Sequence, residues 1–382
     1  MTASWEPSQK APEDEVAVAS LKHKAAKLMS WIGARWLARL VLTLVIGLIG
    51  AFAASSIHMP LAWMLGPFLF CAAASLSGLP LKSVPHGREV AQSIVGLAIG
   101  LRFTAPVLAA TATLLPAMAL TTMFVMIVTT VGAFLIMPIG RLDPKTAFFS
   151  TAAAGMADMA TIAVQRGGDP NAVSVVHAIR VSMVVLSVPL LLFAFGEQGT
   201  SVHNHVHMRE DVLSILIAIG LAYIAARILN LTHFPNPWLI GGCVLGGILA
   251  GTDLLLVGIP RPLMLICQLV IGVSLGVRFE RDLILKLPRV VAAALVITFY
   301  MIVATALGAM LLSWGTGLPY GTSFLSIAPA AVTEMVLTAQ AMHLDAEIVT
   351  AFHVMRIALI EATILIVFAI FTRIHTWRGG AI

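Results

Sequence analysis

The chain of 382 residues is 59% hydrophobic and 11% charged, and its mean hydropathy is +0.98. Soluble domains are roughly 45–50% apolar and about 25% charged, so this composition excludes an ordinary soluble domain and predicts an integral membrane protein. The net charge of +5 comes from basic residues scattered through short connections, a pattern typical of membrane topology signals rather than of a nucleic-acid surface.

Apolar segments of about 20 residues follow a polar N-terminal tail, and this is the length that a helix needs to cross a membrane. They do not alternate as the strands of a membrane β-barrel do, so an all-α membrane protein is expected. The first group is predicted at 37–55, 61–79, 89–108, 114–138, 146–165 and 172–196, and the second at 212–230, 236–256, 262–280, 290–314, 321–341 and 347–372.

The chain contains one module twice. Ala152–Val181 aligns without a gap with Ala328–Ile357 at an offset of about 176 residues, and the same offset aligns Gln92–Phe103 with Gln268–Phe279. Ionisable positions match as well as apolar ones: Asp158 with Glu334, His177 with His353, Arg180 with Arg356, and Arg102 with Arg278. The predicted domains are a tail (1–36), a first repeat (37–196), a loop (197–211), a second repeat (212–372) and a C-terminal tail (373–382).

Basic loops predict how the two copies are oriented, because lysine and arginine favour the cytoplasmic side. The densest basic loop, 278–289, is cytoplasmic only if one segment per copy fails to cross. The fifth segment, rich in small residues and dotted with polar ones, is the best candidate. We therefore expect two inverted repeats, each with about five crossing helices and one broken or re-entrant segment, and both termini in the cytoplasm. The alternative, twelve full crossings with parallel halves, leaves this loop on the wrong side.

Asp158 and Glu334 lie in these fifth segments, at membrane depth. An ionised carboxylate there must be paired, protonated or in a watery cavity, which predicts a site for a coupling proton or cation. The structural alternative is a fixed ion pair with an arginine of a neighbouring helix, or a cap on a half-helix. Glu361, whose counterpart is Val185, breaks the symmetry between the copies and is either a further coupling residue or a structural hydrogen-bonding group.

Arg180 and Arg356 lie about ten residues into their apolar helices, and His177 and His353 precede them by one helical turn. An arginine fork that faces a cavity binds carboxylate or phosphate groups, so these four residues are predicted to receive the solute. The alternative is that each arginine only neutralises Asp158 or Glu334.

The remaining signals are weaker. Arg102 and Arg278 follow helices with a G-x-x-x-G pattern, whose glycines favour close helix packing, and either arginine could anchor at the interface or touch a ligand. Cys71, Cys243 and Cys267 lie in apolar segments without metal-ligand spacing, and three alternating histidines at 203–207 fit a solvated loop better than a metal site. We expect no metal and no cofactor.

The W-x-x-G segments (Trp63–Gly66 and Trp238–Gly241), the G-x-x-x-G-x-R-F helices and the GMADM and VTEM elements resemble the AbrB family of bacterial membrane proteins, which is defined by such a duplication. The resemblance covers the chain from about residue 38 onward, and it does not concern the soluble DNA-binding regulator of the same name. It implies a likeness to inverted-repeat transporters of the bile-acid and cation/proton antiporter type. Members have also been described as ammonia monooxygenases or as regulators of gene expression.

The predicted function is a secondary transporter of the bacterial inner membrane, for a small anionic solute coupled to a proton or another cation. Discontinuous segments at matching positions of inverted repeats are the sequence mark of such transporters. An enzyme is not expected, since the apolar segments hold no copper or di-iron ligand pattern. The alternative is a membrane sensor that regulates gene expression through a separate effector. The predicted partners are the solute and the lipid bilayer, with no nucleic acid, and a homodimer would be in keeping with other secondary transporters.

Overall fold

The computed structural model describes residues 35–196, 211–232, 234–252 and 258–377, and within them every regular element is a helix. This confirms the all-α prediction. The predicted tail 1–36 and the loop 197–211 with its three histidines lie mostly outside the described residues. Of the predicted tail 373–382, residues 373–377 belong to the last helix and the rest lie outside the described residues.

The helices of the two copies correspond in order, and the starts of most pairs differ by about 176 residues. The first copy contains Arg35–Ser56, α2 (Ala62–Leu76), α3 (Gly87–Gly100), α4 (Ala105–Thr113), α5 (Leu115–Gly140), α6 (Pro144–Thr151), α7 (Met156–Gln165) and α8 (Pro170–Ala194). The second contains α9 (Val212–Leu231), α10 (Pro237–Thr252), α11 (Arg261–Gly276), α12 (Arg281–Lys286), α13 (Pro288–Thr316), α14 (Tyr320–Ile327), α15 (Val332–Ala341) and α16 (Ala346–Trp377).

Seven helices in the described residues are long and apolar enough to cross a membrane, so the protein is a multi-pass membrane protein. Ten full crossings were expected from the sequence. One of the seven runs through α11 and α12, from Arg261 to Lys286. Three further helices are shorter: α2 has 15 residues, α3 has 14 and α10 has 16. At about 1.5 Å per residue they span roughly 21–24 Å, less than the hydrocarbon core.

The fifth segment of each copy is divided into two short helices, α6 and α7 in the first and α14 and α15 in the second. Ala152 and Ala328, which end α6 and α14, are both extended, with ψ of 134° and 136°. Pro329 explains the second break, since proline lacks an N–H and pushes the preceding residue out of the helical region. The first break has no proline, and Gly155 is the N-cap of its second helix.

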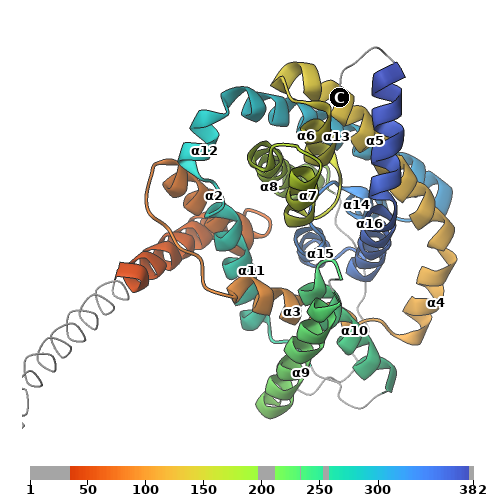
Figure 1. Ribbon diagram of the computed structural model, residues 1–382. Helices are drawn as coiled ribbons and strands as arrows, with labels where there is room; N and C mark the ends of the chain where they lie inside the picture. The colour runs from red at the N-terminus through yellow and green to blue at the C-terminus, as the bar shows by residue number, and fades with distance from the viewer. Residues whose placement is uncertain (1–34, 197–210, 233, 253–257, 378–382) are drawn as a thin grey trace, which may run out of the picture.

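The helices form two bodies, visible in Figure 1 as a lower-left and an upper-right group. The scaffold body comprises Arg35–Ser56, α2, α3, α9, α10 and α11. The core body comprises α5 to α8 and α13 to α16, and only a few contacts, chiefly from α15 and α16 to α3, join the two. Each body takes helices from both sequence copies, so the repeats are not the units that pack.

Glycines allow close packing of scaffold helices in pairs, each with one helix from the first copy and one from the second. A Cβ at Gly96 of α3 would overlap the carbonyl oxygen of Leu239 in α10, and a Cβ at Gly272 of α11 would overlap that of Met64 in α2. The G-x-x-x-G pattern therefore serves close helix approach between the copies, as the sequence indicates.

The central pair of the core body shows how the copies are related. Gly132 of α5 lies against Ile297 and Met301 of α13, whereas Gly308, further along α13, lies against Phe124, earlier in α5. The two helices occupy equivalent positions in the repeats and run antiparallel. This is the relation that inverted copies require.

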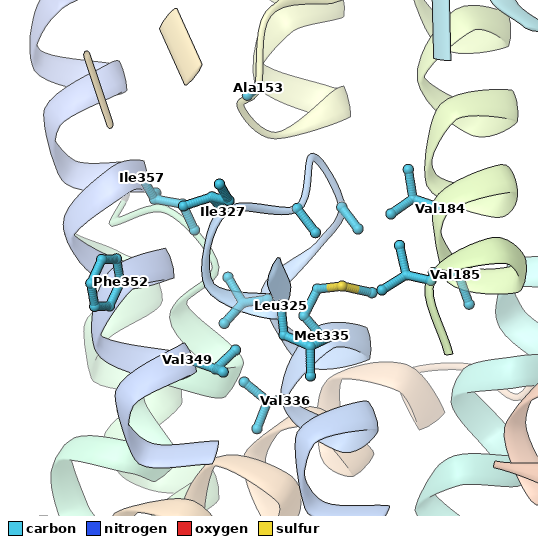
Figure 2. Packing of buried hydrophobic residues seen from close by; sticks show 14 of the residues in the cluster. Ala153, Val184, Val185, Leu325, Ile327, Met335, Val336, Val349, Phe352 and Ile357 are labelled. Carbon is cyan, nitrogen blue, oxygen red and sulfur yellow. The ribbon is translucent and has the colours of Figure 1, made fainter. Parts of the chain in front are cut away.

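The second break lies inside the hydrophobic core, whereas the first is buried at Ala152 and Ala153 and exposed at Gly155. Figure 2 shows the segment between α14 and α15 with Val349, Phe352 and Ile357 of α16 on one side and Val184 and Val185 of α8 on the other. Met335 and Val336 of α15 are fully buried in this cluster. Non-helical backbone at this depth leaves polar groups that the protein itself must satisfy.

Candidate functional site

The predicted arginines satisfy the broken backbone. Arg180 on α8 donates through Nη1 to the carbonyl oxygens of Thr151 and Ala152, each at 2.9 Å. Arg356 on α16 donates to the carbonyl oxygens of Ala328, at 2.7 Å, and Ala330, at 3.0 Å. These carbonyls lie at the ends of α6 and α14, where the helix has no partner for them and where a cation is favourable.

The predicted histidines support the arginines from the same helices. His177 Nε2 lies 2.9 Å from the carbonyl oxygen of Phe149, and its Nδ1 lies 3.0 Å from Arg180 Nη2. His353 makes the equivalent contacts to Leu325, at 2.8 Å, and to Arg356, at 2.7 Å. Since an arginine can only donate, Nδ1 accepts and Nε2 carries the proton. Both ring nitrogens are thus used by the protein, and the histidines position the arginines.

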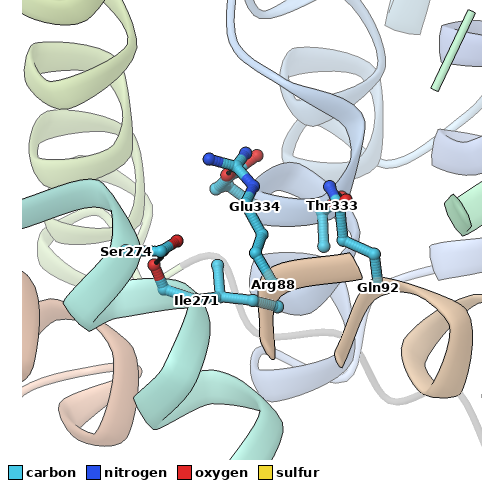
Figure 3. Close-up of polar contacts among 6 residues, drawn as sticks. All are labelled: Arg88, Gln92, Ile271, Ser274, Thr333 and Glu334. Carbon is cyan, nitrogen blue, oxygen red and sulfur yellow. Dashed lines mark hydrogen bonds and ion pairs between the residues drawn. The ribbon is translucent and has the colours of Figure 1, made fainter. Parts of the chain in front are cut away.

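Glu334 pairs with Arg88, one of the basic residues that the sequence indicates only as topology signals. Its Oε1 lies 3.0 Å from Arg88 Nη2, at the start of α3, and its side chain is fully buried. One turn along α3, Gln92 donates to the hydroxyl of Thr333 at 3.0 Å. Figure 3 shows both contacts between α3 and α15, so they tie the scaffold body to the core body. A positive charge one turn before the repeated Gln92 could have signalled this pair.

Asp158 occupies the position equivalent to Glu334 but is exposed. In both copies the carboxylate is in the first turn of the second half-helix, where the positive end of the helix dipole stabilises a negative charge. Oδ2 of Asp158 folds back toward Gly155, and a Cβ at that glycine would overlap it. The residue equivalent to Arg88 in the other repeat is Met264. Asp158 therefore has no arginine at the position from which Arg88 pairs with Glu334. In the described residues, neither Asp158 nor Glu334 makes a salt bridge with Arg180 or Arg356.

One cavity of about 370 Å³ joins the two breaks, within the range of about 300–1,000 Å³ usual for small-molecule sites. It is lined by the N-terminal ends of α7 and α15, by Arg180 and Arg356, and by apolar side chains that include Val181, Trp238 and Pro329. Neither half-helix has a side-chain cap at its N-terminus. The cavity therefore combines buried guanidinium groups with uncapped helix N-termini, which together favour an anion.

The remaining predicted residues divide between this cavity and the protein's periphery. Glu361 and Arg278 line the cavity, and Glu361 lies within electrostatic range of Asp158. Arg102 lies away from it and pairs with Glu347 at 3.7 Å. The described residues contain no group of three or more histidine, cysteine, aspartate or glutamate side chains that could hold a metal ion. What the arrangement offers is charge recognition in a partly open cavity.

The chain is similar to known proteins over most of its length. Residues 63–372 match the model of the family described as "Transition state regulatory protein AbrB". The uncharacterised protein YhjN of Bacillus subtilis (strain 168) is 25% identical over 339 residues, 82% of this chain and 88% of that protein. A protein of Escherichia coli (strain K12) that carries the name AbrB, with a provisional description as a regulator, is 23% identical over 315 residues, 82% of this chain and 90% of that protein.

Proposed function

The chain belongs to the AbrB family, and from this premise we propose that it is a secondary transporter of the bacterial inner membrane that moves a small anionic solute coupled to a proton or another cation. The solute occupies the cavity at the two breaks, between the scaffold body and the core body. The termini face the cytoplasm, in keeping with the basic residues beside them.

A single observation carries this proposal: two buried guanidinium groups lack a carboxylate partner. Arg180 is 3% exposed and Arg356 is 4% exposed, and neither makes a salt bridge within the described residues. Nε of each is buried without a hydrogen-bond partner. An uncompensated buried charge is costly, so a cavity that holds two of them is suited to an anion that supplies the missing acceptors.

Coupling is assigned to the carboxylates of the same cavity, Asp158 and Glu361. They lie in electrostatic range of each other, and no salt bridge to either occurs within the described residues. A proton or cation shared between them would balance the anion. Glu334 is committed to Arg88 in this conformation, and it can join the coupling only if that pair opens.

The test is transport by the purified protein in proteoliposomes, with small carboxylates offered under an imposed proton or sodium gradient. We expect uptake of at least one carboxylate that depends on the gradient. In Arg356→Lys, uptake should fall by about tenfold or more, because an ammonium cannot reproduce the guanidinium fork. Arg373→Lys, an exposed arginine on the same helix, is the matched control and should transport normally.

Folding must be separated from function, because Arg356 also caps α14. The melting temperature of each variant is therefore measured without ligand, and that of the wild type is measured with and without the carboxylate. A ligand at a hundredfold excess over its Kd stabilises the folded state by about 2.7 kcal/mol. Absence of both uptake and stabilisation in the wild-type protein would remove the basis for the transporter proposal.

A second candidate, a sensor that regulates gene expression, is favoured by the description of the E. coli relative as a regulator. It would act through a separate effector that docks on the N-terminal tail. Deletion of the first 30 residues discriminates the two: transport should survive the deletion, whereas regulation through a docked partner should be lost. Expression profiles of the deletion strain and of the wild type give the readout.

A further inference from the structure

The charged groups that line the cavity separate into those that are already satisfied and those that are not. Arg88 is paired with Glu334, and His86 lies in contact with Glu89. Arg278 is exposed. Four groups remain without a partner of opposite charge in the described residues: Arg180, Arg356, Asp158 and Glu361.

These four groups carry two positive and two negative charges, so an anion alone would satisfy only half of them. Glu361 Oε1 is buried without a hydrogen-bond partner, as are Arg180 Nε and Arg356 Nε. The unsatisfied atoms are thus both donors and acceptors. A bound solute that supplied a negative and a positive group would meet both sets.

Geometry separates the two sets within the cavity. Arg356 and Glu361 are five residues apart on α16, which places their backbones about 7.5 Å apart along the helix axis. Asp158 lies in the first turn of α7, on the far side of the break from the carbonyls that Arg180 caps. The lining of the cavity also includes the apolar or aromatic side chains of Val181, Trp238 and Pro329.

We propose that the solute is a zwitterion, an amino acid or amino-substituted carboxylate, whose carboxylate is bound by Arg180 and Arg356 and whose ammonium is bound by Asp158 and Glu361. This inference rests on the proposed transport function and names its substrate class: the carboxylate of the solute is the anionic group, and its ammonium takes the place of the separate cation at Asp158 and Glu361. One zwitterion gives each of the two pairs a group of opposite charge and loses translational freedom once, whereas a separate anion and cation would each lose it. The carbon chain of the solute packs on the apolar lining.

The experiment compares solutes that differ only in the ammonium group. The Kd of the purified wild-type protein is measured for leucine against 4-methylpentanoate, and for 4-aminobutanoate against butanoate. In leucine the ammonium is on the carbon next to the carboxylate, and in 4-aminobutanoate it is at the other end of the chain, so the two pairs test a short and a long separation of the charges. We expect at least one amino acid to bind about tenfold or more tightly than its deaminated partner, as the loss of a charge-assisted hydrogen bond predicts.

The same measurements are made on Glu361→Gln and Asp158→Asn, with Asp282→Asn, an exposed aspartate of α12, as the control. The preference for the amino acid should shrink to about twofold or less in the first two variants and persist in the third. Equal binding of an amino acid and its deaminated partner would overturn the zwitterion and leave the anion transporter standing. Binding of none of the four solutes would overturn both proposals.

Discussion

At the scale of single residues, the two copies share equivalent histidine and arginine pairs but differ in the environment of their carboxylates. The histidine and arginine pairs are nearly equivalent, since each pair satisfies the carbonyls at its own helix break. The carboxylates differ: Glu334 is buried against Arg88, whereas Asp158 is exposed. One substitution between the copies, Met264 in place of Arg88, accounts for the absence of the second ion pair.

The Arg88–Glu334 pair leads to a prediction about stability. Arg88→Met copies the residue of the other repeat and leaves Glu334 buried without its cation. We expect a loss of roughly 3 kcal/mol in the free energy of unfolding, because one partner of a buried ion pair remains unpaired. The measurement is unfolding in detergent, and a double variant with Glu334→Gln should recover much of the loss. A double variant as unstable as the single one would show that Arg88 contributes by packing instead.

At the scale of helices, close approach in the scaffold body depends on positions without a side chain. Gly96 and Gly272 face backbone carbonyls of α10 and α2, which cannot move aside as a flexible side chain can. By contrast, Gly220 of α9 has open space around it. All three glycines are in helices, so alanine gains the same helix propensity at each. The difference between them therefore measures the cost of the overlap between the new Cβ and the neighbouring backbone.

Alanine substitutions at these glycines are expected to have opposite effects. Gly96→Ala and Gly272→Ala should each destabilise the protein by about 1–3 kcal/mol, because the helices must separate. Gly220→Ala should stabilise it by up to about 1 kcal/mol, since alanine favours the helix and meets nothing. Melting temperatures in one detergent provide the comparison. Equal effects at Gly96 and Gly220 would contradict the packing described for α3 and α10.

At the scale of the molecule, the proposed transport function requires the core body to move against the scaffold body. Few contacts join them, and the polar ones include Arg88 to Glu334 and Gln92 to Thr333. Helices packed this sparsely can slide or rotate as units, which is the usual basis of alternating access around a fixed site. The structure represents one conformation, in which α15 is held against α3.

A cross-link between the bodies should stop transport. Cysteines at Gln92 and Thr333, whose side chains are in hydrogen-bonding contact, are introduced after Cys71, Cys243 and Cys267 have been replaced by alanine. They are joined by a bifunctional thiosulfonate, because cysteine is shorter than glutamine and a direct disulfide needs closer Cβ atoms. We expect the cross-link to reduce uptake by about tenfold or more and a reductant to restore it. Cysteines at Ser75 and Phe279, which both lie within the scaffold body, are the control, and their cross-link should leave uptake unchanged. Full uptake by the cross-linked Gln92 and Thr333 variant would exclude relative movement at this contact.

The sequence by itself determined the membrane character, the helix positions, the duplication and the break in each fifth segment, because these follow from local hydrophobicity, small residues and self-similarity. It also selected the ionisable residues that line the cavity, except Arg88 and Glu89. The tertiary structure decided which helices form each body, which arginine pairs with Glu334, and that the histidines and arginines cap broken helices. Such contacts join residues up to 246 positions apart, as Arg88 and Glu334 do, and no local pattern encodes them. Both bodies draw on both repeats because α3 packs on α10, α2 on α11 and α5 on α13.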